Sequence, residues 1–320
     1  MIKKSNFQYV IFFMSIVIVY IVLFYVSVFW QANPAASLWF APAGMTVAIV
    51  ILWKRAGFFL VWLCNFLMVI FALSFASFGQ GWANLSLISA VEGFAHVLPY
   101  FFGILLSEKL EQVVSKYNDG LILRSIVYAV SILIASLMSS LLGLLAQYYF
   151  EKMTMETVSD LFLTFWVGDL VGAVILGPLF IIFIVRYFNN FINPRNTILY
   201  NFSIDALVIP KNYVDIFLSL LIALTLSFMV YLNSEIDSRI PISVAFVFCL
   251  VPLVILAQRC GWGTLLFANF LASIGVIFVI HDKNNFSAIS YQTTLIGVMF
   301  VSMFFVSYQR AWRLGNTPVN

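Results

Sequence analysis

The chain has 320 residues, of which 63% are hydrophobic and only 9% are charged, and its formal net charge is +3. Soluble domains carry roughly 25% charged residues, so this composition, with a mean hydropathy of +1.04, excludes an ordinary soluble domain. The basic residues form no run or face of the kind that binds nucleic acid. We therefore expect membrane lipid as the main partner and no nucleic acid.

The long apolar runs predict membrane-spanning helices. Only helices and closed barrels satisfy backbone hydrogen bonds in hydrocarbon, and these runs do not alternate in polarity. The first run, Val10 to Trp30, is too long for the apolar part of a signal peptide, so we expect an uncleaved span. The predicted fold class is all-α integral membrane, with about ten transmembrane helices at 8–29, 37–53, 57–77, 84–106, 124–149, 159–186, 213–232, 241–257, 261–280 and 289–308.

The basic residues predict the orientation of these spans. With the N-terminus inside, the outer loops hold only three of the 16 Lys and Arg: Lys152, Arg239 and Lys283. Cytoplasmic loops collect Lys and Arg, and adding or removing one span would scramble this asymmetry downstream. We therefore expect a multi-pass protein of the bacterial inner membrane with both termini in the cytoplasm.

A possible parallel internal repeat appears at an offset of 204 residues, where 50–67 and 254–271 share eight identities in eighteen positions. The matches include Arg55 with Arg259 and Asn65 with Asn269. This offset aligns spans one to four with spans seven to ten, although identities between apolar helices also arise by chance. We expect one domain over 1–320, with halves 1–186 and 213–308 joined by the cytoplasmic segment 187–212.

Ionisable residues inside the predicted spans are few, and their burial is costly, so they are functional candidates. Glu92 and His96 share one face of the fourth span, and Asp169 lies in the sixth. At about 1.5 Å of rise per residue, these groups and Asn65 of the third span reach a similar depth near mid-membrane. We predict one polar site for a ligand or a proton; the alternative is a packing role for a neutral carboxylic acid.

The charges favour certain occupants of this site. No Lys or Arg lies at its depth, which favours a proton, a metal ion or a positively charged ligand over an anion. The Glu-x-x-x-His spacing is not a zinc signature, and Cys64, Cys249 and Cys260 have no paired spacing. We therefore predict no set of metal ligands, no disulfide and no cofactor.

Small and aromatic residues mark two helix segments as structural. Trp39 is expected as an interfacial anchor, with Pro42 in the first turns of the second span and Gly44 permitting close helix approach. In the sixth span, Trp166 precedes a Gly168-xxx-Gly172 packing face, and Pro178 follows.

These motifs resemble the MASE1 domain, a bacterial membrane sensor domain, over nearly the whole chain. They are Leu38-Trp39-Phe40-Ala41-Pro42-Ala43-Gly44, Lys54-Arg55-Ala56-Gly57, Glu92-Gly93, and Trp166-Val167-Gly168-Asp169 with Gly172 and Pro178. Such domains normally precede a histidine kinase, a diguanylate cyclase or a cyclic-di-GMP phosphodiesterase. No signature of these outputs follows the last predicted span, so the resemblance implies a stand-alone input module.

Two functions remain open at this point. The first is a sensory or regulatory membrane module that binds an unknown small ligand and signals through a separate kinase, diguanylate cyclase or other signalling protein. The alternative is a transporter of a cation or small solute, which the repeat and the mid-membrane acids also fit. An enzyme is not expected, because only Cys64 with His96 could supply a nucleophile and its base.

Overall fold

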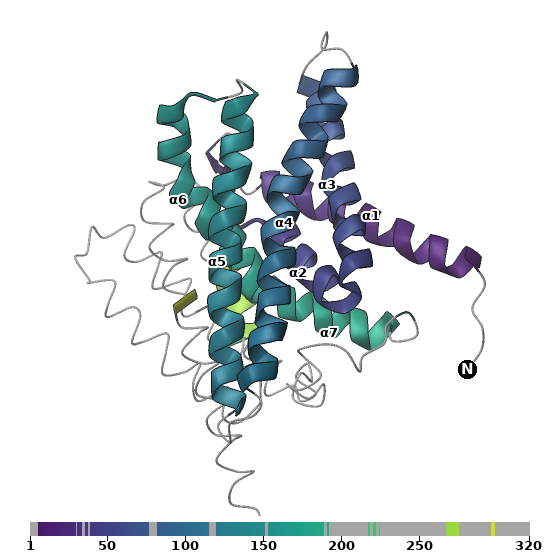
Figure 1. The fold of residues 1–320 in the computed structure, drawn as a ribbon, viewed down its shortest axis with the longest axis vertical. Helices are drawn as coiled ribbons and strands as arrows, with labels where there is room; N and C mark the ends of the chain where they lie inside the picture. The colour runs from purple at the N-terminus through teal and green to yellow at the C-terminus, as the bar shows by residue number, and fades with distance from the viewer. Residues whose placement is uncertain are drawn as a thin grey trace, which may run out of the picture.

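The computed structural model describes residues 6–29, 31–33, 36–37, 39–76, 82–114, 120–150, 153–188 and 191, with short pieces at 217, 220–221, 224, 267–274 and 296–297. Its main elements are α1 (Asn6–Phe29), β1 (Gln31–Asn33), β2 (Ala36–Ser37), α2 (Ala41–Trp53), α3 (Arg55–Ala76), α4 (Trp82–Val114), α5 (Gly120–Tyr149), α6 (Met155–Val171), η1 (Gly172–Leu176) and α7 (Gly177–Phe188). Helices α4 and α5 run side by side, with α3 and α6 flanking them (Figure 1).

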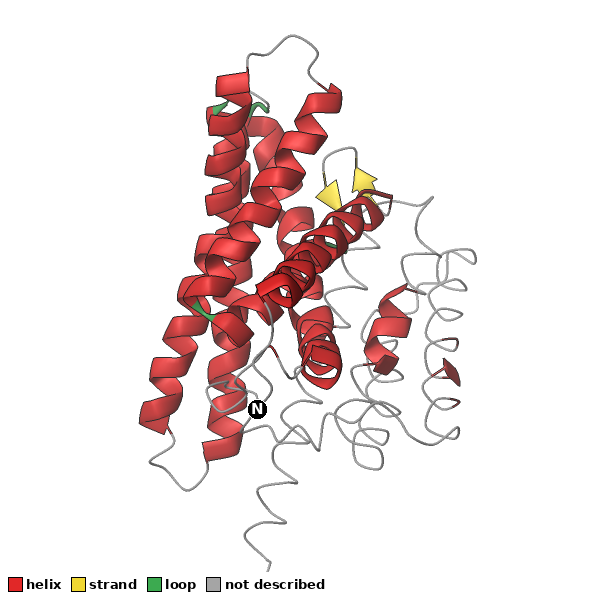
Figure 2. Cartoon of the chain, turned by 90° about the vertical axis from the view of Figure 1, so that its right-hand side faces the viewer, coloured by secondary structure: helices red, strands yellow, loops and turns green. Residues whose placement is uncertain are grey.

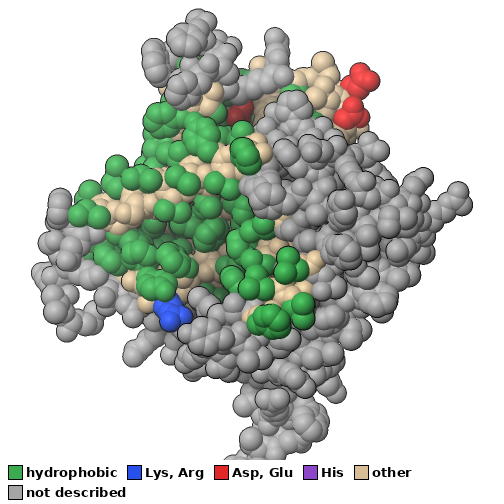
Figure 3. Space-filling model, turned by 180° about the vertical axis from the view of Figure 1, so that it is seen from behind, with side chains coloured by type: hydrophobic (Ala, Val, Ile, Leu, Met, Phe, Trp, Pro, Cys, Tyr) green, Lys and Arg blue, Asp and Glu red, His purple; other side chains and the backbone are tan. Residues whose placement is uncertain are grey.

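Five helical stretches in the described part are long and apolar enough to cross a membrane: Tyr9–Phe29, Arg55–Ala72, Asn84–Val113, Ile126–Tyr149 and Met155–Phe188. They correspond to the predicted spans one, three, four, five and six. One face of the molecule carries many hydrophobic side chains, and its visible charged groups lie near the upper and lower margins (Figure 3). The fold is therefore that of a multi-pass helical membrane protein.

Most of the second half lies outside the described residues. This applies to most of predicted spans seven to ten, to most of the segment 187–212, and therefore to the second half, 213–308, on which the proposed repeat depends. The piece 267–274 is an exception, because its Ala268 and Ala272 are buried in the same hydrophobic core as α2.

The second predicted span begins later than expected. Residues 36–37 form β2, which pairs with β1 in an antiparallel hairpin (Figure 2), and the helix begins at Ala41. A helix that began at residue 37 would place Pro42 in its interior, where the ring blocks a hydrogen bond, whereas a proline is tolerated in the first turn. The prediction of 37–53 was therefore wrong at its start.

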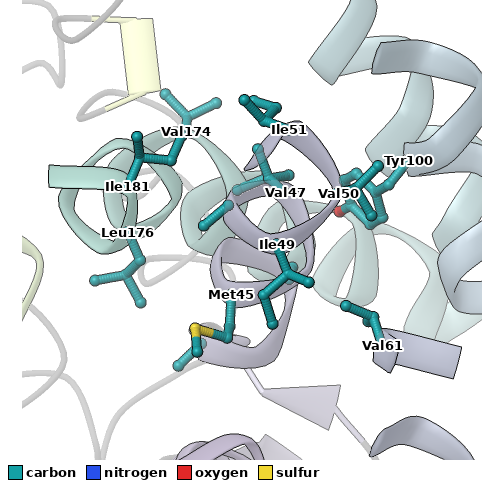
Figure 4. Packing of buried hydrophobic residues seen from close by; sticks show 14 of the residues in the cluster. Met45, Val47, Ile49, Val50, Ile51, Val61, Tyr100, Val174, Leu176 and Ile181 are labelled. Atoms are coloured by element: carbon teal, nitrogen blue, oxygen red, sulfur yellow. The ribbon is translucent and has the colours of Figure 1, made fainter. Parts of the chain in front are cut away.

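The resulting α2 is short and central. Its 13 residues extend over about 20 Å, less than the roughly 30 Å of a bilayer core. Every residue from Ala41 to Leu52 is buried. Figure 4 shows its side chains between Val174, Leu176 and Ile181 of η1 and α7 and Val61 of α3. Because no face of α2 is left for lipid, it forms the core on which the crossing helices pack.

The sixth span is interrupted where it meets α2. The predicted single helix 159–186 is divided by the π-helical turn η1. A Cβ at Gly44 would lie 2.5 Å from the Gly172 carbonyl oxygen, and a Cβ at Gly172 would overlap the Phe40 carbonyl. The Phe40 N–H also donates to the Gly168 carbonyl oxygen at 3.1 Å. The start of α2 is thus held directly against the backbone of α6 and η1.

The ends of four helices meet at the opposite end of α2. Phe12 near the start of α1 stacks on Phe191 at 4.5 Å between ring centroids and contacts Trp53 at 5.6 Å. Lys54, in the turn after α2, forms a 3.2 Å ion pair with Glu108 near the end of α4. The basic residues predict that these ends share the cytoplasmic side of the membrane, and that orientation stays a prediction.

Candidate functional site

Asp169 is the buried carboxyl group of α6, with 2% of its surface exposed. The Ser140 hydroxyl of α5 contacts its Oδ2 at 3.4 Å and also donates to the Ser136 carbonyl at 2.9 Å. A hydroxyl carries one proton, so the shorter bond takes the larger share of it. Asp169 has no ion pair with any of the described Lys, Arg or His side chains. Within the described part of the chain, this carboxyl group therefore has no ion pair and a long contact from Ser140.

His96 of α4 reaches the same part of α5. Its Nδ1 lies 3.4 Å from the Ser139 hydroxyl, which donates to the His96 carbonyl oxygen at 3.2 Å. Gly143, one turn further along α5, makes room for the ring, since a Cβ there would lie 2.7 Å from Cε1 and 2.9 Å from Nε2. The Phe40 ring covers the imidazole from the start of α2 at 6.1 Å. The His96 ring of α4 thus packs between α5 and the start of α2.

Tyr100 lies one turn after His96 on the same face of α4, and it is 1% exposed. Its hydroxyl lies close enough to interact with the side chains of Asp169 and Ser139. Among the described residues, however, none forms a hydrogen bond of acceptable geometry with it. Pro99 between the two residues lacks an N–H and frees the carbonyl of the preceding turn. The Tyr100 hydroxyl is therefore a buried polar group that lies near the Asp169 carboxyl group without a well-formed hydrogen bond to it.

We call His96, Tyr100, Ser139, Ser140 and Asp169 the Asp169 cluster. Both serines are fully buried, and the five side chains come from α4, α5 and α6. By helical rise, His96 lies about 18 Å from Glu108 along α4. The cluster therefore lies in the middle part of α4, at the level where α2 begins.

A second polar network lies beside this cluster. The Asn65 amide of α3 donates to the Tyr20 hydroxyl of α1 at 2.8 Å, and that hydroxyl lies 3.0 Å from Thr46 Oγ1 of α2. Tyr20 interacts electrostatically with both Tyr100 and Asp169. The second network thus joins α1, α2 and α3 next to the cluster.

The four predicted site residues are distributed unevenly. His96 and Asp169 meet the adjacent serines of α5, whereas Asn65 belongs to the neighbouring network. Glu92 is buried on α4 and makes an interaction of its own, but it takes no part in the hydrogen bonds that join His96 and Asp169 to the serines. No group of three or more His, Cys, Asp or Glu that could hold a metal occurs among the described residues.

The predicted structural residues pack around these networks. Trp166 donates from Nε1 to Ser136 Oγ at 3.2 Å, and Pro42 lies in the first turn of α2. Pro178 is buried at the start of α7. Trp39 is only 6% exposed and packs on Phe270 at 6.0 Å, so it is a core residue and not the interfacial anchor that we expected.

The sequence predicted α5 as the span 124–149 but identified no site residue on it. Its residues Ser131, Ala135, Ser139 and Gly143 recur every four positions and face α4, where a Cβ on Gly103 would meet Ala135 at 2.8 Å. Ser136 and Ser140 form a second row that faces α6. Such small-residue rows are the usual signal of close helix packing in membranes and could have identified both serines of the cluster.

Comparison with known families gives a match over nearly the whole chain. The MASE1 family model matches residues 8–311. No curated protein matches the chain, and no solved structure matches it.

Proposed function

The chain belongs to the MASE1 family of membrane-associated sensory domains, and from this premise we propose that it senses a small ligand at the Asp169 cluster and signals through a separate partner protein. A histidine kinase or a diguanylate cyclase is the partner class that this family's architecture suggests. The observation that carries the proposal is the buried Asp169 carboxyl group, which has a long 3.4 Å contact from Ser140 and lies beside a buried Tyr100 hydroxyl that forms no hydrogen bond among the described residues. Burying such a group is costly in lipid, which favours a role beyond packing.

The position of the cluster supports transmission of a signal. Asp169 is three residues before η1, and η1 packs on α2 through Gly172 and Gly44. A ligand that draws α4, α5 and α6 together would shift α6 against the start of α2, because Phe40 is bonded to the Gly168 carbonyl. Packed helix interfaces convert such small shifts into discrete rearrangements. The far end of α2, beside the Lys54–Glu108 pair, is where we expect a cytoplasmic partner to detect the change.

The sensory role is tested in cells with two substitutions on the same helix. Asp169→Asn keeps the size of the side chain and removes its charge, whereas Asp160→Asn changes an exposed acid of α6. With equal amounts of protein in the membrane, Asp169→Asn should reproduce the transcript and second-messenger profile of a deletion strain, and Asp160→Asn should resemble the wild type. A deletion strain with an unchanged profile would contradict a sensory function.

Transport of a cation or small solute is the second candidate. A π-helical turn within a transmembrane helix is frequent at functional sites, and a buried carboxyl group such as Asp169 also marks ion pathways in membranes. Uptake assays separate the two functions. Loss of solute accumulation in the deletion strain without a change in gene expression would favour transport.

We further propose that both termini lie in the cytoplasm, on the basis of the Lys and Arg distribution. Reporter fusions after Arg195 and Asn320 should read cytoplasmic. Fusions after Gly79 and Ser234 should read periplasmic. A periplasmic C-terminus would remove the ten-span arrangement.

A further inference from the structure

We propose that the occupant of the Asp169 cluster is a monovalent metal cation, with Na⁺ the ion that fits best. This inference rests on the proposed function for the choice of site and goes beyond it by naming the ligand. Oxygen atoms of Asp169, Ser139, Ser140 and Tyr100 would supply the ligands. Carboxylate and hydroxyl oxygens are hard donors, which suit hard cations.

Charge balance selects a single positive charge. Asp169 carries one carboxylate, and none of the described Lys, Arg or His side chains forms an ion pair with it. A divalent ion would leave an excess positive charge in a medium of low dielectric constant, which is strongly unfavourable. The other titratable groups of the surroundings, His96, Tyr100 and Tyr20, add no second negative charge when they are neutral.

Burial selects a small occupant. The side chains of Asp169 and Tyr100 are 2% and 1% exposed, and those of Ser139 and Ser140 are fully buried. An organic amine would have to separate α4, α5 and α6, where Gly103 of α4 lies against the Ser131 carbonyl of α5 and Gly143 of α5 lies against the His96 ring. An ion of the size of a water molecule needs only local adjustment of hydroxyl groups.

The three hydroxyl groups distinguish a cation from a proton. A proton on Asp169 would also cancel the charge, but a protonated carboxyl group donates a single hydrogen bond and so reaches one of the hydroxyl oxygens of Tyr100, Ser139 and Ser140. A cation beside the carboxylate uses the lone pairs of Tyr100, Ser139 and Ser140 at once. The Ser140 hydroxyl can keep its donated bond to the Ser136 carbonyl while its lone pairs bind the ion.

The test uses the purified full-length chain in nanodiscs of zwitterionic lipid. Thermal unfolding is followed in NaCl and in choline chloride at constant ionic strength and pH. A ligand that binds only the folded state raises the midpoint with its concentration. We expect Na⁺ to stabilise the wild type and Asp160→Asn equally, and radioactive Na⁺ to bind once per chain.

Two substitutions in the cluster then separate the outcomes. Asp169→Asn should abolish the Na⁺ effect, and Tyr100→Phe should raise the Na⁺ concentration of half effect about tenfold, as the loss of one ligand bond predicts. Should Asp169→Asn fail to fold, Tyr100→Phe and Ser140→Ala carry the test.

Three results would overturn the inference: equal unfolding of the wild type in Na⁺ and choline, an unchanged Na⁺ effect in the folded cluster variants, or a stabilisation that follows pH and not Na⁺. The last would identify a proton site. These measurements need no partner protein, so they test the ion site separately from the sensory role. If the wild type binds Na⁺ but Asp169→Asn gives normal cellular output, only the proposed sensory role is refuted.

Discussion

Substitution of Gly143 by alanine should disturb His96 without changing any polar or titratable group. The added Cβ would lie 2.7 Å from His96 Cε1 and 2.9 Å from Nε2. Carbon atoms in good contact are about 3.5–4.0 Å apart, so the ring has to retreat by roughly 1 Å. The His96 Nδ1–Ser139 contact is already 3.4 Å, and such a movement breaks it.

The energetic cost follows from three contributions. Overpacking costs about 1–3 kcal/mol, and the lost hydrogen bond adds about 0.5–1.5 kcal/mol. Replacing a mid-helix glycine by alanine returns about 1 kcal/mol through helix propensity. We expect a net destabilisation of about 1–3 kcal/mol, measured as the shift in unfolding free energy in detergent micelles.

Gly103→Ala is the matched control, because it overpacks the same α4–α5 interface away from the cluster. Its Cβ would meet the Ala135 Cβ at 2.8 Å and the Ser131 carbonyl oxygen at 3.1 Å. These atoms yield less than a side-chain ring does, so the control should destabilise the protein at least as strongly. Signalling should nevertheless fail only in Gly143→Ala, at equal abundance in the membrane.

A double-mutant cycle isolates the contact with His96. Gly143→Ala should cost less in a His96→Ala background, with a coupling of about 1 kcal/mol, because the clash is absent there. If the two glycine variants lose signalling in parallel with their stability, the position of His96 has no functional role. Additive effects in the cycle would show that the ring and residue 143 do not meet.

Three further predictions concern the frame around the cluster. Gly172→Ala should destabilise by about 3 kcal/mol or more in the same unfolding assay, because its Cβ overlaps the Phe40 carbonyl and neither backbone can yield. Lys54→Gly should stabilise by about 1 kcal/mol, because Lys54 has φ 51° and ψ −117°, a backbone conformation that favours glycine. The lost ion pair with Glu108 contributes less, since the Lys54 side chain is 39% exposed. A lower midpoint for Lys54→Gly than for Lys54→Ala would contradict this. Trp166→Phe should lose about 1 kcal/mol with its bond to Ser136 and leave the Na⁺ dependence unchanged, and a changed dependence would show that Trp166 acts on the cluster.

Hydropathy predicted the crossing helices well because lipid requires a continuous helix with apolar side chains across the whole membrane. The predicted 8–29 and 57–77 correspond to α1 and α3 within two residues at each end. The end of α4 was missed, since its helix continues to Val114 through Ser107, Lys109 and Gln112. A helix with such polar residues can continue from the membrane into water. The loss of hydropathy therefore marks the membrane boundary and not the end of the helix.

The break in the sixth span illustrates what hydropathy cannot detect. Residues 172–176 are all apolar or glycine, and nothing in their polarity distinguishes a π turn from an α-helical one. The cause is tertiary: the backbone of Gly172 accommodates the Phe40 carbonyl at the start of α2. Such a contact depends on two segments that lie 132 residues apart in the chain, and a local pattern does not contain it.

The charged half of the candidate site was predicted from the sequence, whereas the small-residue rows of α5 could have marked Ser139 and Ser140 as packing positions but not as neighbours of Asp169. His96 and Asp169 were identified because ionisable groups are rare in lipid-spanning segments. Tyr100, Ser139 and Ser140 carry no such signal, because tyrosine and serine occur throughout the spans. Their importance follows from their partners, and partners are known only once the helices are assembled.

The neutral residues also explain how such a site can exist in two states. The Ser140 hydroxyl has a bond to the carbonyl one turn before it at 2.9 Å and a contact with Asp169 at 3.4 Å. A serine hydroxyl that can donate to a carbonyl of its own helix keeps a hydrogen bond when an occupant departs. The free-energy cost of emptying the site is therefore lower than it would be for fixed charged ligands. The two states then differ by little free energy, and a ligand of modest affinity can shift their populations. A carboxyl group set among serines therefore fits a sensor better than a permanent structural ion pair would.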